Sequence, residues 1–92
     1  MKTNNKEIFV FDNNGETFDR YTIILKEDAS LFGASENPFN PLGFGQYCGE
    51  TNKDINVYVN DAQKDPTWLG KEITDINELP INVQKYINLI TK

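Results

Sequence analysis

Two β-type segments separated by a turn-forming sequence constrain the fold of this chain more than any other feature. EIFVF (Glu7–Phe11) is short and densely apolar, TFDRYTIIL (Thr17–Leu25) follows it, and DNNGE lies between the two. Asn and Gly readily adopt the positive φ angles that a tight hairpin turn needs. Alternate side chains of a strand point to opposite faces, so Tyr21, Ile23 and Leu25 share one face, and the other face also carries apolar residues. We therefore predict a β-hairpin whose second strand lies near the middle of a sheet.

Two more segments have strand character. LFGA (Leu31–Ala34) follows a turn sequence and is predicted as a brief strand. In INVYVN (Ile55–Asn60), Ile, Val and Val alternate with Asn, Tyr and Asn. This period-two pattern is typical of a strand on a sheet with one solvent-exposed side.

The C-terminal sequence NELPINVQKYINLITK predicts a helix. Pro80 suits the first helical position, because its missing N–H has no partner there in any case. Apolar residues recur at helical spacing, and these are Leu79, Val83, Tyr86, Ile87 and Ile90. We expect this helix to lie across one face of the sheet.

Together these elements predict an α+β fold. A chain of 92 residues is expected to form one small domain, here residues 1–92. The expected architecture is a small antiparallel sheet of three or four strands opened by the β-hairpin. A short helix or ordered loop near residues 40–48 and a C-terminal helix packed on the sheet complete it.

The segment SENPFNPLGFGQYCGE (Ser35–Glu50) has two interpretations. In the preferred one, residues 40–48 form a short helix with Asn40 as N-cap, Pro41 as the first helical residue and Gly49 as the residue that ends it. In the other, the segment is an ordered loop that presents aromatic side chains to a partner. The residues predicted to bind a partner are Ser35, Glu36, Asn37, Phe39, Phe44 and Tyr47.

The chain is acidic, with 14 Asp and Glu against 9 Lys and Arg and a formal net charge of −5. Nucleic-acid binders usually carry a basic patch, and here no two basic residues are adjacent, so nucleic acid is not the expected partner. No apolar stretch approaches the roughly 20 residues that span a bilayer, and the N-terminal sequence lacks the apolar region of a signal peptide. We expect a cytoplasmic protein without a membrane partner.

The residue inventory argues against catalysis. Histidine is absent, which removes the usual general base near neutral pH and the commonest metal ligand. Cys48 is the only cysteine and lies beside acidic Glu50, so a small buried apolar side chain is expected rather than a reactive thiol. Asp12, Glu16 and Asp19 do not match the spacing of a calcium loop and are predicted as solvated turn residues.

The glycine-rich sequence GFGQYCG is not a phosphate-binding motif. It matches neither G-x-G-x-x-G nor a P-loop, and no basic residue occurs from Glu36 to Asn52. We therefore predict a protein that is not an enzyme and has no cofactor and no metal site.

Four segments of the chain resemble one protein family. They are DRYTIIL, FGASENPFNPLGFGQYCG, LGKEI and ELPINVQKYI, and they fall within residues 15–50 and 69–90. The string SENPxxPxGFxQYCG is the most specific of these features. The chain is similar in them to small uncharacterised proteins that bacteriophages, prophages and other bacterial mobile elements carry. The resemblance implies a mobile-element context, and it carries over no activity and no site residue.

Three functions are compatible with these features. The first is a small protein-interaction or regulatory module, of phage or mobile-element origin, that acts on a host or defence protein. The second is a binding module for a small ligand or single-stranded nucleic acid that uses the aromatic Asn-Pro/Gly segment for stacking. The third is a structural subunit of a larger assembly or a homo-oligomer, in which INVYVN pairs edge to edge. We expect the partner to be a protein.

Overall fold

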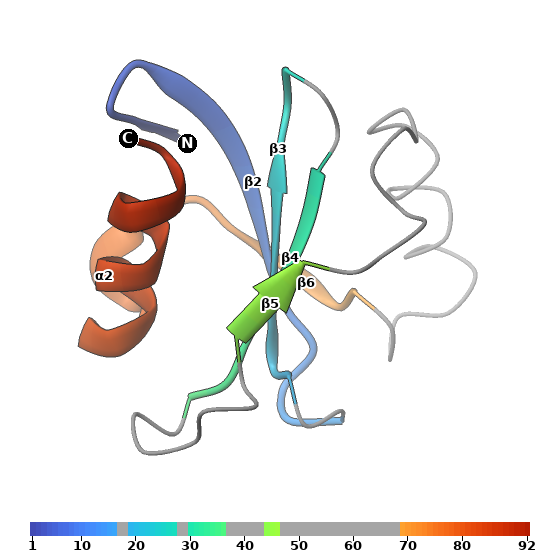
Figure 1. Cartoon of the computed structure of the whole chain (residues 1–92). Coiled ribbons are helices and arrows are strands. Elements are labelled where there is room, and N and C mark those ends of the chain that lie inside the picture. Colours follow the sequence, from blue (N-terminus) through green and yellow to red (C-terminus); the bar gives the residue numbers. More distant parts are fainter. Residues whose placement is uncertain (17–18, 28–29, 37–43, 47–68) are drawn as a thin grey trace.

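A computed structural model of the chain describes residues 1–16, 19–27, 30–36, 44–46 and 69–92, with residues 44–46 described by their backbone only. Six strands, one 3₁₀ turn and one α-helix form within these ranges (Figure 1). In chain order they are β1 (Lys2–Thr3), β2 (Lys6–Asp12), β3 (Tyr21–Leu25), β4 (Ser30–Ala34), β5 (Phe44–Gln46), β6 (Lys71–Ile73), η2 (Ile76–Glu78) and α2 (Ile81–Ile90).

All strands belong to one antiparallel sheet in the order β1-β2-β3-β4-β5, and β6 also pairs with β2. One edge of β2 pairs with β3 from Ile8 to Asp12. Its other edge is shared, because β1 lies opposite Lys6 and Glu7 while β6 lies opposite Val10–Asp12. The predicted hairpin and the central position of its second strand are confirmed. The strand starts at Tyr21 rather than at residue 17, because the ladder with β2 ends where Asp12 faces Tyr21.

The first face of the sheet packs against α2 (Figure 1). Val83 and Ile87 of the helix are fully buried, and Leu79, just before it, is nearly so. The sheet contributes Tyr21, Ile23 and Leu25, the residues predicted to share one face of the central strand, and residues of the neighbouring strands, namely Ile8, Val10 and Ala34. The α+β class and the helix packed on the sheet are therefore confirmed.

The second face of the sheet is also apolar. Phe11, Ile24, Leu31 and Leu69 form a buried cluster there, with Phe9 packed beside it. Ile24 on this face and Ile23 on the first are both completely buried. This double burial explains why β3 reads as a nearly continuous apolar run rather than as a simple alternation.

The main difference from the sequence prediction concerns residues 40–48. The short helix expected there is wrong for Phe44–Gln46, which form β5 and pair with Phe32–Ala34 of β4. Gly45 lies directly opposite Gly33 in this ladder. Glycine disfavours a helix interior, and the free edge of β4 satisfies the backbone of this segment instead. Two further strands, β1 and β6, were not predicted because they are only two and three residues long.

The remaining predictions differ from the structure by one residue or concern residues that the structure does not describe. Pro80 is the N-cap of α2 with an extended ψ of 150°, so the helix begins one residue later than predicted. The strand predicted for Ile55–Asn60, and the predictions for Cys48 and Gly49, lie outside the described residues.

The two ends of the described fold meet at the C-terminal end of α2. Asn4 and Asn5 connect β1 to β2 with φ angles of 52° and 66°, both in the left-handed region. The Asn4 side-chain amide donates to the Asn88 side-chain oxygen at 2.8 Å and to Thr91 Oγ1 at 3.1 Å. The first turn of the chain therefore secures the last turn of the helix (Figure 1).

Candidate functional site

The structure places two of the six predicted binding residues with their side chains. Ser35 is buried at 4% exposure, whereas Glu36 is exposed. Phe44 belongs to β5, and its side chain is not described. Asn37, Phe39 and Tyr47 lie outside the described residues. The predicted binding surface therefore stays a prediction, and only its first two residues are positioned here.

Glu36 is held by an arginine that also secures the β2–β3 hairpin. Arg20 donates from Nε to Asp12 Oδ1 at 2.7 Å and from NH2 to Asp12 Oδ2 at 3.0 Å, which is a bidentate pair. Its NH1 donates to Glu36 Oε2 at 2.9 Å. The hydrogen bond from Arg20 lowers the pKa of Asp12 below its usual range, and burial opposes this shift. Asp12 is thus not the solvated turn residue that the sequence predicted.

The same arginine lies near an aromatic ring. The Arg20 guanidinium carbon is 5.4 Å from the centre of the Tyr21 ring, within the range of a cation–π contact. Its hydrogen bond with Asp12 raises the pKa of Arg20 above its ordinary value. Burial raises the pKa of Tyr21. These groups remain an arginine cation and a neutral phenol at neutral pH, and the arginine is paired with the carboxylates of Asp12 and Glu36.

Ser35 is tied to α2 through its backbone. Asn82, in the first turn of the helix, donates from its side chain to the Ser35 carbonyl oxygen at 3.0 Å. The end of β4 is therefore held by the helix at Ser35 and by Arg20 at Glu36. This arrangement places the start of the predicted binding segment beside the first turn of α2.

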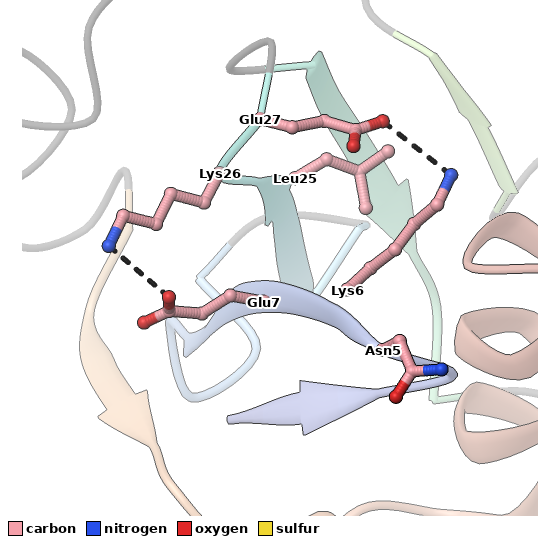
Figure 2. Close-up of a pocket in the computed structure, with 6 residues that line it drawn as sticks. All are labelled: Asn5, Lys6, Glu7, Leu25, Lys26 and Glu27. Atoms are coloured by element: carbon pink, nitrogen blue, oxygen red, sulfur yellow. Dashed lines mark hydrogen bonds and ion pairs between the residues drawn. The ribbon is translucent and has the colours of Figure 1, made fainter.

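A hollow of about 360 Å³ lies at the other end of the hairpin (Figure 2). Leu25 lies between two ion pairs, Lys6–Glu27 at 3.5 Å and Lys26–Glu7 at 3.2 Å. Continuing the β2–β3 register past Ile8 and Leu25 places Glu7 opposite Lys26 and Lys6 opposite Glu27. Each charge in this hollow is neutralised by an opposite charge across the hairpin. These ion pairs stabilise the register of the two strands and leave no net charge to bind a charged ligand.

The outer face of α2 carries the large apolar side chains that the fold leaves uncovered. Within the described part of the chain, Ile81 and Leu89 are the exposed large apolar residues, at 64% and 65% exposure. At 100° per residue they are about 80° apart around the helix, and Lys85 falls midway between them. Lys85 is exposed as well. The sequence prediction followed the buried stripe of this helix and missed the second, outward apolar pair, although the same helical spacing reveals it.

The described residues offer no centre for a metal ion and no membrane span. In the described ranges no three His, Cys, Asp or Glu side chains come together in a way that could hold a metal ion. Neither of the helical segments within those ranges has the length and apolar character needed to cross a bilayer.

No family model, curated protein or solved structure matches this chain.

Proposed function

We propose that this chain is a small protein-interaction module that binds its partner through the outer face of α2. The observation that carries the proposal is the exposure of Ile81 and Leu89 on one face of a helix whose opposite face buries Val83 and Ile87 completely. Single exposed apolar residues are common on protein surfaces. A pair on one short helix, two turns apart, is the arrangement by which helices present anchors to a partner.

The energetics favour a covered state for this face. Removing an Ile or Leu side chain from water contributes roughly 1.5–3 kcal/mol when burial is complete. Ile81 and Leu89 are still 64% and 65% exposed to water. Nearly two thirds of this stabilisation is therefore still to be gained when a partner covers each side chain. Asn82 joins this face to Ser35 at the end of β4. The end of β4, where the predicted binding residues Ser35 and Glu36 begin, thus lies next to the first turn of α2 at Ser35.

The proposal describes a binding protein rather than an enzyme. The absence of histidine from the chain supports it. The cluster of Asp12, Arg20 and Glu36 supports it as well, because every charged group in that cluster is already paired. A regulatory role in a phage or another mobile element, directed at a host or defence protein, is part of the proposal and rests on the family resemblance alone.

Photo-crosslinking from defined positions tests the proposed surface. A crosslinking amino acid at Glu78, an exposed residue three positions before Ile81, is expected to capture a stoichiometric protein partner in native cells. The same group at Glu72, an exposed residue of β6 away from the helix, serves as the control. Capture from both positions alike, or from Glu72 only, would contradict the proposed surface.

Substitution of Ile81 and Leu89 is the second part of the crosslinking experiment. Ile81→Ser with Leu89→Ser should abolish capture while the circular dichroism spectrum and thermal midpoint stay near those of the unchanged protein. Capture that persists in this doubly substituted protein would show that the partner binds elsewhere.

A further inference from the structure

The outer face of α2 differs in charge from the rest of the chain. Residues 81–92 contain Lys85 and Lys92 and no acidic residue. Since the whole chain has a net charge of −5, the two lysines leave −7 for the other residues. The exposed apolar pair is thus accompanied by positive charge on a strongly negative molecule.

Lys85, like Lys2, Lys71 and Lys92, is not among the described basic residues that form ion pairs. Lys6, Arg20 and Lys26 each pair with a carboxylate of the same chain. Lys85 makes no ion pair with any part of the chain that the structure describes, and it lies one turn from both Ile81 and Leu89. An uncompensated charge between two apolar side chains favours a partner that supplies the opposite charge at that point.

A second copy of this chain does not fit the surface. Any helix pairing that packs Ile81 and Leu89 against the same residues of a copy, parallel or antiparallel, sets Lys85 opposite its counterpart, and like charges repel.

An anionic membrane is a poorer fit than a protein. Helices that lie in a membrane interface have a wide apolar face, whereas the outer face of α2 offers two apolar side chains.

We propose that the outer face of α2 binds an acidic amphipathic segment of another protein. Two apolar side chains of that segment pack on Ile81 and Leu89, and a carboxylate between them pairs with Lys85. This inference rests on the proposed function and specifies the chemistry of the partner. Lys85 is then the residue that sets specificity, and the apolar pair supplies most of the affinity.

A displayed library of helical peptides, selected against the full chain, tests this chemistry. Selected peptides are expected to carry Asp or Glu between two apolar residues spaced one to two turns apart. Lys85→Glu should weaken their binding about tenfold. Lys71→Glu makes the same charge change at an exposed residue of β6 and should alter the affinity less than about twofold.

The outcomes separate this inference from the proposed function. Peptides that lose binding on Ile81→Ser with Leu89→Ser but bind Lys85→Glu normally would overturn the acidic partner and leave the docking surface in place. Peptides indifferent to both sets of substitutions, or a selection that yields no binder, would overturn the inference, and crosslinking from Glu78 then decides the proposed function independently.

Two further measurements test whether a membrane or a second copy of this chain binds the outer face of α2 instead. Co-sedimentation with phosphatidylglycerol vesicles that depends on Ile81 and Leu89 would overturn the inference in favour of a membrane surface. A dimer detected by light scattering and abolished by the same two substitutions would overturn it in favour of a second copy. We expect neither.

Discussion

The Asn4 side-chain amide lies 2.8 Å from the Asn88 side-chain oxygen and so connects the first turn of the chain to its last helix. The same amide is 3.3 Å from the Asn88 carbonyl oxygen, one of the last acceptors of α2. These contacts span 84 residues of sequence. They help hold the helix end against the β1–β2 turn, where no local sequence signal predicts a neighbour.

Asn4→Gly should lower the free energy of unfolding by about 1 kcal/mol, because it removes the side-chain hydrogen bonds to Asn88 and Thr91. Glycine tolerates the φ of 52° at this position, so the loss reports the contacts and not backbone strain. Urea denaturation measures the change.

Asn5→Gly is the matched control in the same turn. Asn5 has φ of 66° and makes no comparable contact with the helix in the described structure, and Asn-Gly is a favoured pair for a two-residue hairpin turn. Its stability should be unchanged or higher by up to about 1 kcal/mol. Equal losses from both substitutions would show that the turn, rather than the contact with α2, determines the effect.

Gly70→Ala should destabilise the fold by at least about 2 kcal/mol. Gly70 has φ of 79°, and an added Cβ would overlap the Asp12 carbonyl oxygen and lie 2.5 Å from the Asn13 Cα. These neighbours are backbone atoms and cannot rotate away. The substitution therefore disturbs the approach of β6 to the end of β2, and thermal unfolding measures it.

Gly15→Ala separates the steric effect from the conformational one. Gly15 has a similar φ of 83°, but nothing lies within 4 Å of an added Cβ. Only the cost of a left-handed conformation remains, about 1 kcal/mol. A loss at Gly15 as large as that at Gly70 would contradict the steric explanation.

Arg20→Gln should reduce stability by about 1 kcal/mol at neutral pH, because it removes the bidentate pair with Asp12. The pair lowers the pKa of Asp12 in the folded protein relative to its ordinary value of 3.8. Its stabilisation is therefore present above that value and is lost as the pH falls below it. Urea denaturation at pH 7 and at about pH 2.5 should show a difference between the two proteins only at the higher pH.

Lys26→Gln provides the comparison for an exposed pair. The Lys26 and Glu7 side chains are 53% and 50% exposed, so water already screens their interaction. Removing the lysine charge should change stability by less than about 0.5 kcal/mol at either pH. An effect equal to that of Arg20→Gln would mean that burial and bidentate geometry do not distinguish the two pairs.

The two faces of α2 should respond differently to truncation. Ile87→Ala removes a fully buried side chain from the core and should cost about 2–5 kcal/mol. Leu89→Ala removes a side chain that is 65% exposed and should change stability by no more than about 0.5 kcal/mol. Thermal unfolding measures both. A large loss at Leu89 would show that its outward position serves folding and not binding.

The candidate surface was only partly predictable from the sequence. Helical spacing predicts that Val83 and Ile87 share a face, and it equally relates Ile81 to Leu89, but spacing does not say which pair the sheet covers. The pairing of Arg20 with Asp12 and Glu36 was also not predicted. These residues come together only because the register sets Asp12 opposite Tyr21 and β4 ends beside the same strand.

By itself, the sequence determined the hairpin, the doubly apolar central strand and the C-terminal helix, because local periodicity and turn residues decide such elements. Tertiary structure alone decided that Phe44–Gln46 form a strand, since β4 had an edge that needed backbone partners. It also decided that Lys71–Ile73 pair with β2 beside β1, through a close approach that Gly70 permits. Short edge strands have too few residues to carry a pattern of their own, so a neighbouring strand specifies them.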